Sequence, residues 1–196
     1  MNFIQHLYRL TKNAIIDVTY GGKFLGGLVE THYAHLGAKR TENSEYEDLK
    51  DIFMGGVKKD DVLVDVGCGK GRVINWWLYN GHENKIVGLE LDPVIGEQTK
   101  RRLRKHTNVT IIDGNAIDNL PHDGTVFFLF NPFNAPIVEN FKHRLSAMLP
   151  SQRGVQIYYY NPKHLDCFAN DSSWKIEQLL LRPTARFQAV KITKVG

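Results

Sequence analysis

The sequence predicts an α/β fold of three layers, in which a seven-stranded, mostly parallel sheet ends in an antiparallel hairpin and follows an N-terminal helical extension. Three observations support this prediction. From Asp61 onward, β-rich runs alternate with helical stretches, which is typical of a parallel sheet covered by helices on both faces. The last two β-rich runs have no helix between them and are therefore expected to pair as a hairpin. A chain of 196 residues is also long enough to bury the core of one such domain.

The composition is that of an ordinary globular protein, with 42% hydrophobic and 23% charged residues. These values exclude a disordered chain, a collagen-like repeat and a disulfide-rich scaffold. The 25 basic and 21 acidic side chains leave a formal net charge of +4, which permits contact with nucleic acid or anionic surfaces without requiring it. The 2 cysteines and 8 histidines show no metal-ligand spacing, so no metal site is expected.

Residues 1–56 are predicted as a helical extension packed on the main domain, which comprises residues 57–196. A first helix would bury one apolar face made of Phe3, Ile4, Leu7, Leu10, Ala14, Ile15 and Val18. A second helix is expected to begin at Asn43 or Ser44 as its N-cap and to place on one side Tyr46, Leu49, Ile52 and Phe53. A helix that lies on a membrane surface is the alternative for this region, and we disfavour it because few basic residues accompany the apolar ones.

The first twenty residues do not resemble a signal peptide, because charged side chains interrupt them at Arg9, Lys12 and Asp17. No run approaches the ~20 apolar residues that a membrane-spanning helix needs. With the scarcity of cysteines, these features predict a cytoplasmic protein.

The main domain is predicted to contain seven strands and three principal helices. The expected parallel strands are 62–66, 85–90, 109–112, 125–130 and 155–160, and the expected hairpin strands are 174–181 and 187–195, with a turn at Pro183. The expected helices are 72–79, 93–106 and 135–149, and Asp92 with Pro93 opens the second of them.

The strongest chemical signal is the segment Asp65-Val66-Gly67-Cys68-Gly69-Lys70-Gly71, which follows the first strand and precedes a helix. Glycines let the backbone turn tightly and approach a ligand closely, because no Cβ intervenes. The turn is expected at the carboxyl ends of the strands, where ligands bind in open α/β sheets. The helix N-terminus beside it suits an anionic group such as a carboxylate or a phosphate.

The glycines of this segment are spaced G-x-G-x-G, and an aspartate stands two residues before the first of them. A dinucleotide dehydrogenase favours G-x-G-x-x-G instead. The observed spacing resembles the first motif of the class I S-adenosylmethionine-dependent methyltransferases, and the resemblance extends from about Asp61 to the end of the chain. It implies a Rossmann-like fold, S-adenosylmethionine as cofactor and S-adenosylhomocysteine as product. It also assigns to the cofactor site Asp65, Gly67, Cys68, Gly69 and Gly71.

Two further segments follow the next strands in the order that this resemblance implies. Glu90 ends the second strand, where an acid can accept hydrogen bonds from both ribose hydroxyls, and Leu91 beside it would line the adenine pocket. After the third strand, Asn115 stands where the family often has an acid, and its side-chain oxygen can accept from the adenine amino group, with Ala116 beside it. Asp113 is an alternative acceptor, and a plain turn is the alternative for the segment.

The fourth strand ends in Asn131-Pro132-Phe133, which resembles the [Asp/Asn]-Pro-Pro-[Tyr/Phe] motif of methyltransferases that act on nitrogen, without the second proline. The Asn131 oxygen and a backbone carbonyl can hold an amine or amide N–H, and an aromatic face attracts positive charge. We therefore interpret these three residues as the catalytic, substrate-positioning motif, with Asn131 also bordering the cofactor. A simple strand-terminating turn is the alternative.

The resulting hypothesis is an S-adenosylmethionine-dependent methyltransferase that acts on a nitrogen acceptor, with a protein side chain such as lysine favoured. An RNA or DNA base is the runner-up acceptor, because residues 100–105 form a basic helical surface. An NAD-dependent oxidoreductase and a non-catalytic cofactor-binding module are the remaining alternatives. From the family resemblance, Tyr46 is a candidate lid residue over the cofactor.

Overall fold

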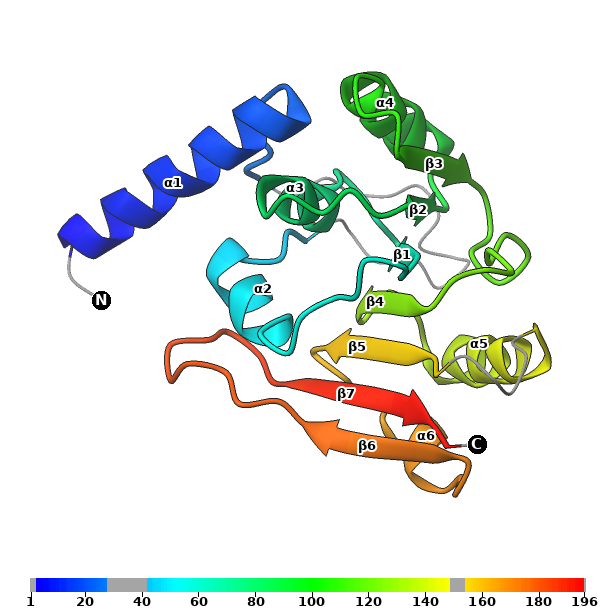
Figure 1. Cartoon of the computed structure of the whole chain (residues 1–196). Coiled ribbons are helices and arrows are strands. Elements are labelled where there is room, and N and C mark those ends of the chain that lie inside the picture. The colour runs from blue at the N-terminus through cyan, green and yellow to red at the C-terminus, as the bar shows by residue number, and fades with distance from the viewer. Residues whose placement is uncertain (1–2, 28–41, 149–153, 196) are drawn as a thin grey trace.

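The computed structural model describes residues 3–27, 42–148 and 154–195, and of residues 3–6 it describes only the backbone. Seven strands form one sheet in the order β3-β2-β1-β4-β5-β7-β6 (Figure 1). The strands are β1 Leu63–Val66, β2 Ile86–Glu90, β3 Val109–Asp113, β4 Val126–Phe130, β5 Gln156–Tyr160, β6 Trp174–Gln178 and β7 Ala189–Lys194. The first five are parallel, and β7 lies antiparallel between β5 and β6, which confirms the predicted sheet and its terminal hairpin.

Helices cover both faces of the sheet, which gives the predicted three layers (Figure 1). They are α1 Phe3–Gly21, α2 Tyr46–Ile52, α3 Arg72–Tyr79, α4 Pro93–Leu103, α5 Ala135–Met148 and α6 Asp166–Ala169. α2 and α3 lie on one face with α1 outside them, and α5 and α6 lie on the other (Figure 1). None of the described helices is long and apolar enough to cross a membrane.

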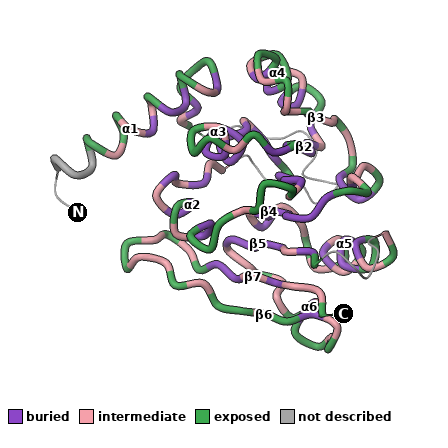
Figure 2. The backbone as a smooth tube through the Cα atoms, in the orientation of Figure 1, coloured by how far each residue is buried: buried purple, intermediate pink, exposed green. Residues whose placement is uncertain are grey.

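The central strands alternate their side chains between two apolar cores, because successive residues of a strand point to opposite faces. In β4, Phe127 packs toward α5, whereas Phe128 packs toward α2 and α3. In β5, Tyr159 and Tyr158 divide in the same way. Figure 2 shows these strands as buried segments enclosed by partly exposed helices. The tyrosines 158–160 are thus core residues.

Several element ends differ from the sequence predictions for local reasons. α2 has Glu45 as its N-cap, where Asn43 or Ser44 was expected, because Glu45 takes the extended backbone that precedes the helix. α4 ends at Leu103, three residues earlier than predicted. The short helix α6 was not predicted, and residue 149, the predicted last residue of α5, lies outside the described residues.

Polar contacts hold α1 against the main domain. The Asp17 carboxylate is fully buried and forms an ion pair with Arg72, with an N–O distance of 2.7 Å. It also accepts hydrogen bonds from the Tyr46 hydroxyl at 2.6 Å and from the Leu25 amide at 3.1 Å. The inward face of α1 is therefore set by the position of Asp17, because a buried carboxylate must be placed where its partners are.

The prediction for the packed face of α1 was wrong. Leu7, Leu10, Ile15 and Val18, which were expected to be buried, are exposed, whereas Asn13, Ile16 and Asp17 are buried. The side chains of Phe3 and Ile4 lie outside the described residues. The helix exists where the spacing predicts it, but the buried ion pair of Asp17 turns most of its apolar stripe outward.

Basic side chains of the α4 end cover the C-terminus of α1. Arg102 donates to the carbonyl oxygen of Gly21 at 2.9 Å, and Lys105 donates to that of Thr19 at 2.7 Å. These carbonyls are among the last four of the helix, which have no partner within it. The cations also face the negative end of the helix dipole. They therefore stabilise the C-terminus of α1, which has no basic residue in its own last turn.

Candidate functional site

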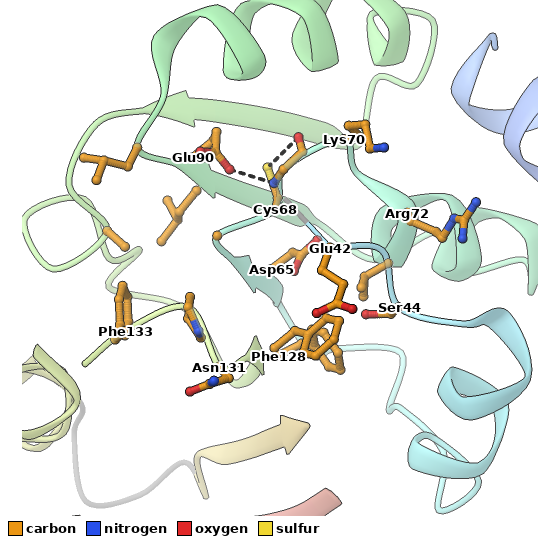
Figure 3. A pocket seen from close by; sticks show the side chains of 18 of the residues that line it. Glu42, Ser44, Asp65, Cys68, Lys70, Arg72, Glu90, Phe128, Asn131 and Phe133 are labelled. Atoms are coloured by element: carbon orange, nitrogen blue, oxygen red, sulfur yellow. Dashed lines mark hydrogen bonds between the residues drawn. The ribbon is translucent and has the colours of Figure 1, made fainter. Parts of the chain in front are cut away.

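A cavity of about 330 Å³ lies at the carboxyl ends of β1, β2 and β4 (Figure 3). Because β2 and β4 flank β1 on opposite sides, the strand order reverses here, which is where open α/β sheets bind their ligands. Eleven of the twelve predicted site residues line this cavity: Asp65, Gly67, Cys68, Gly69, Glu90, Leu91, Asn115, Ala116, Asn131, Pro132 and Phe133. The topology therefore brings together segments that are far apart in the sequence.

The glycines of the first loop fit its sharp turn. Gly67 has a φ of 75°, Gly69 of 51° and Gly71 of 74°, in the left-handed region that side chains disfavour. A Cβ on Gly67 would stand 3.0 Å from the Cβ of Pro132, so this glycine lets the loop after β1 approach the one after β4.

Gly71 is not among the residues that line the cavity, and its position indicates a structural role. It is the N-cap of α3, and a Cβ there would stand 3.0 Å from the γ-methyl of Thr99 on α4. The glycine thus permits close packing of α3 against α4. This packing supports the glycine loop on the side away from the cavity.

Glu90 is buried at the end of β2 and fixes the glycine loop. Its carboxylate accepts from the Gly69 amide at 2.7 Å, drawn as a dashed line in Figure 3, and from the Asp92 amide at 3.0 Å. Burial raises its pKa. Two carboxylate oxygens offer about four acceptor positions, so Glu90 retains capacity for the ribose hydroxyls that the sequence assigns to it. Its role in holding the loop was not predicted.

Asp65 presents an unsatisfied carboxylate to the cavity. Its Oδ2 is buried and has no hydrogen-bond partner among the described residues. Burial and, secondarily, the charge of Glu90 raise the pKa of Asp65 to about 8. A buried carboxylate without a donor is costly, so this position fits a ligand that brings a cationic or N–H group. The ammonium group of an amino-acid moiety has that chemistry, so the residues present fit the expected cofactor.

In the predicted adenine-binding segment, the side-chain oxygen of Asn115 is already engaged in a hydrogen bond within the protein. Asn115 lines the cavity, but its Oδ1 already accepts from the Ile117 amide at 3.0 Å. A carbonyl oxygen has a second lone pair, so it remains a possible acceptor. Asp113, the alternative acceptor, is not among the lining residues and stands instead against Gly96 of α4.

Asn131 lies at the end of β4 with a φ of 44°, which is uncommon for a residue with a side chain. It is only 5% exposed, and its Oδ1 has no hydrogen-bond partner among the described residues. Figure 3 shows it in the wall of the cavity between Phe133 and Phe128. Asn161, at the end of the neighbouring β5, also lines the cavity and has a φ of 54°. Two strained asparagines thus stand at adjacent strand ends, as is common at functional sites.

Another wall of the cavity was missed by the sequence analysis. It consists of Glu42, Asn43 and Ser44 from the segment before α2, together with Lys70 and Arg72. Figure 3 shows the Glu42 carboxylate directed into the cavity. No local motif marks the 42–44 segment, and only the tertiary fold, which seats it against the glycine loop, identifies it.

Lys70 joins that loop to the N-terminal segment. Its Nζ donates to the carbonyl oxygens of Leu25 at 2.6 Å and of Gly26 at 3.3 Å, and also to that of Gly27. Burial, and then the charge of Arg72, lowers the pKa of Lys70 to about 8. Its ammonium group is therefore committed to the backbone of residues 25–27.

Tyr46 is not a lid. It is buried, does not line the cavity, and donates its hydroxyl to Asp17, so the expectation that it folds over the cofactor was wrong. Its apolar ring packs in the core while its hydroxyl reaches the Asp17 carboxylate. Within the described ranges, no group of His, Cys, Asp and Glu side chains could hold a metal ion.

Comparison with known proteins agrees with this geometry. Residues 63–149 match a protein family described as a methyltransferase domain. None of the curated proteins matches the chain. A methyltransferase from Pyrococcus furiosus has a similar structure, with a TM-score of 0.66 and 16% identity over 99% of this chain and 100% of that one.

Two other solved structures share the fold. An RNA methyltransferase from Salinibacter ruber, solved with S-adenosylhomocysteine, has a TM-score of 0.55 and 18% identity over 78% of this chain and 90% of that one. The mitomycin 7-O-methyltransferase MmcR has a TM-score of 0.58 and 14% identity over 76% of this chain, which spans only 54% of MmcR. Such low identities show a common fold and leave the acceptor open. With the match of residues 63–149 to a methyltransferase domain and the observed sheet order, they show that this chain has the fold of the class I methyltransferases.

Proposed function

We propose that this chain transfers a methyl group to a nitrogen acceptor, and that the acceptor is a protein side chain such as lysine. When bound, S-adenosylmethionine supplies a methyl group on a positively charged sulfur. The residues that would hold it are Asp65 for the ammonium group, the loop 67–69 for the amino-acid end, Glu90 for the ribose, and Leu91 with Asn115 and Ala116 for the adenine.

The unpartnered Oδ1 of Asn131 is the observation that carries the choice of nitrogen. A buried amide oxygen without a donor favours a ligand that brings an N–H group. An amide has no useful proton affinity, so Asn131 would orient the acceptor and leave its lone pair aimed at the methyl group. Positioning of this kind supplies much of the rate of a direct displacement. A hydroxyl acceptor would need a base, and Asn131 is not one.

The charge around the cavity supports an amine. Glu42 directs its carboxylate into the cavity and pairs with Arg186, whose guanidinium also lies 4.8 Å from the ring centroid of Phe187. The contacts of Arg186 with Glu42 and Phe187, beside the cavity, show that this carboxylate and a neighbouring aromatic ring attract a cation. The aromatic walls at Phe130 and Phe133 would favour the uncharged form of a lysine side chain, which is the form that can accept a methyl group.

The basic helical surface at 100–105 gives less support to a nucleic-acid base as acceptor. None of its side chains lines the cavity in the described part of the chain. Arg102 and Lys105 are engaged with carbonyl oxygens of α1. A base acceptor therefore remains an outcome of the following test and is not the proposal.

The cofactor site is tested by calorimetric titration with S-adenosylhomocysteine. Wild-type protein is expected to bind, and Gly69→Val and Glu90→Ala are expected to weaken binding at least tenfold, because they distort the loop or remove its anchor. Asn140→Ala, which alters another residue of the cavity wall, is the control and should keep most of the affinity. A well-folded wild-type protein that does not bind would contradict the assignment of the cofactor residues.

The acceptor is tested with cofactor that carries a labelled methyl group, offered with a pool of lysine-containing peptides or with total RNA. We expect labelled methyl-lysine, and we expect Asn131→Ala to lower the transfer rate by about 100-fold while S-adenosylhomocysteine still binds. Label that appears only in RNA, or as an alkali-labile ester in the peptides, would contradict the proposed acceptor.

A further inference from the structure

The outward face of α1 is more apolar than its inward face. Along this face, Leu7 is 53% exposed, Tyr8 69%, Ile15 61% and Val18 53%. Figure 2 shows exposed segments along the outer side of this helix. A surface helix of a globular protein normally turns its apolar stripe toward the core, so the arrangement here is reversed. We call these four residues the α1 stripe.

Cations border this stripe at the C-terminal end of the helix. Thr19 lies one turn after Ile15, and its carbonyl accepts from Lys105, just after the end of α4, at 2.7 Å. Close to Lys105 in the sequence, Lys100, Arg101 and Arg104 are exposed, and Lys23 is exposed just after α1; of these, Arg101 is paired with Glu97 of α4 at 2.8 Å. α1 and α4 are in direct contact (Figure 1). The fold therefore joins the C-terminal end of α1 to basic residues at the end of α4, some eighty residues later in the sequence.

We propose that the α1 stripe and this basic cluster form a docking surface for an anionic lipid bilayer, with α1 lying in the plane of the membrane interface. An interfacial helix inserts its apolar face at the level of the headgroups, and nearby Lys and Arg side chains hold it to anionic lipids. The aromatic side chain of Tyr8 suits the same boundary, because it presents an apolar ring and a polar hydroxyl.

The combination of features favours a bilayer over two other partners. A nucleic acid would use the cations but would leave the α1 stripe in water. A second copy of this chain, docked stripe to stripe about a twofold axis, would cover the apolar residues but would offer no anionic partner to either basic cluster. An anionic bilayer is complementary to both the apolar and the basic part.

The test is cosedimentation of the full chain with vesicles of phosphatidylcholine alone or of phosphatidylcholine mixed with phosphatidylglycerol. We expect binding to the mixed vesicles and at least tenfold weaker binding to the neutral ones. Ile15→Asp/Val18→Asp is expected to reduce binding to the mixed vesicles at least tenfold. Lys100→Gln/Arg104→Gln is expected to reduce it as well and to weaken its dependence on salt, because anionic lipids attract these cations through screened charges.

A matched control adds two acids at other exposed apolar side chains. Met54→Asp/Leu180→Asp alters residues that are 77% and 86% exposed and lie outside α1 and α4, and it should bind vesicles as the wild type does. Affinity for S-adenosylhomocysteine should be unchanged in all three double variants, which verifies that each is folded.

Three results would overturn the proposal. One is vesicle binding that Ile15→Asp/Val18→Asp and the control reduce equally. Another is a wild-type dimer in sedimentation equilibrium that only Ile15→Asp/Val18→Asp dissociates, without any vesicle binding. The last is binding to an RNA oligonucleotide that depends on Lys100 and Arg104 but not on Ile15 and Val18, again without vesicle binding.

Discussion

Asp65 and Glu90 lie in the same region of the cavity wall, but their carboxylates are in different states. Glu90 accepts two backbone N–H groups, whereas Asp65 Oδ2 accepts none from the described residues. Glu90 therefore has donors from the protein itself, whereas a ligand could supply the donor that Asp65 Oδ2 lacks among the described residues. The missing hydrogen-bond donor agrees with the raised pKa of Asp65, about 8, because a buried carboxylate without a donor is more stable as the neutral acid.

The raised pKa of Asp65 makes the stability of the ligand-free protein depend on pH. Asp65 titrates near 4 in the unfolded chain and at about 8 in the folded one, so in this window the folded state binds the extra proton. Stability contributed by the neutral acid is complete at low pH and falls as the pH rises from about 4 to about 8. In urea denaturation, Asp65→Asn should show a smaller loss of unfolding free energy across this window than the wild type.

The exposed residue Asp60 provides the control, since Asp60→Asn should keep the wild-type slope. Some slope will persist in Asp65→Asn, because the pKa of Glu90 is raised in the same direction. Slopes that are equal in wild type and Asp65→Asn would contradict the interpretation of Asp65. Saturating S-adenosylhomocysteine should also flatten the wild-type slope, if its ammonium group meets this carboxylate.

At the scale of the elements, α1 shows how one buried polar residue outweighs several apolar ones. Asp17 joins three parts of the chain: Arg72 at the start of α3, Tyr46 at the start of α2, and the amide of Leu25. The Arg72 guanidinium lies 5.2 Å from the ring centroid of Tyr46, which adds a cation–π contact. This cluster attaches the N-terminal segment to the helix that follows the glycine loop.

Removing the carboxylate should therefore be strongly destabilising. Asp17→Ala leaves the buried Arg72 without its partner, and breaking such a pair costs about 3–5 kcal/mol. The exposed pair of Lys85 and Asp123 is a matched control, for which Lys85→Ala should cost less than about 1 kcal/mol. Urea denaturation measures both, and similar costs for the two variants would show that the Asp17 cluster does not hold α1.

Elements with a local signature could be predicted from the sequence. The alternation of β-rich runs and helices, the glycine loop, Glu90 and the Asn131 segment were placed correctly, because strand ends and turns depend on nearby residues. The inward face of α1 could not be predicted, since it depends on Asp17 meeting Arg72 fifty-five positions later. The wall at residues 42–44 was missed for the same reason.

At the scale of the whole molecule, the cavity is built from two parts of the chain that meet at the glycine loop. The sheet supplies Asp65, Glu90 and Asn131 from three strand ends, and the N-terminal segment supplies residues 42–44. Lys70 connects the two parts, because it belongs to the loop and donates to the carbonyl groups of residues 25–27. A ligand in the cavity should therefore stabilise the N-terminal segment along with the loop.

Amide hydrogen exchange can detect this coupling. We expect S-adenosylhomocysteine to slow exchange in residues 42–45 and 22–27 as well as in the loop 67–71, since a ligand that binds only the closed arrangement suppresses local opening. Lys70→Met removes the donor to residues 25–27 and should weaken the protection of that segment while the loop stays protected. Lys50→Met, at an exposed lysine of α2, is the control and should behave as wild type. Protection confined to the loop in the wild type would mean that the N-terminal segment lines the cavity without responding to its ligand.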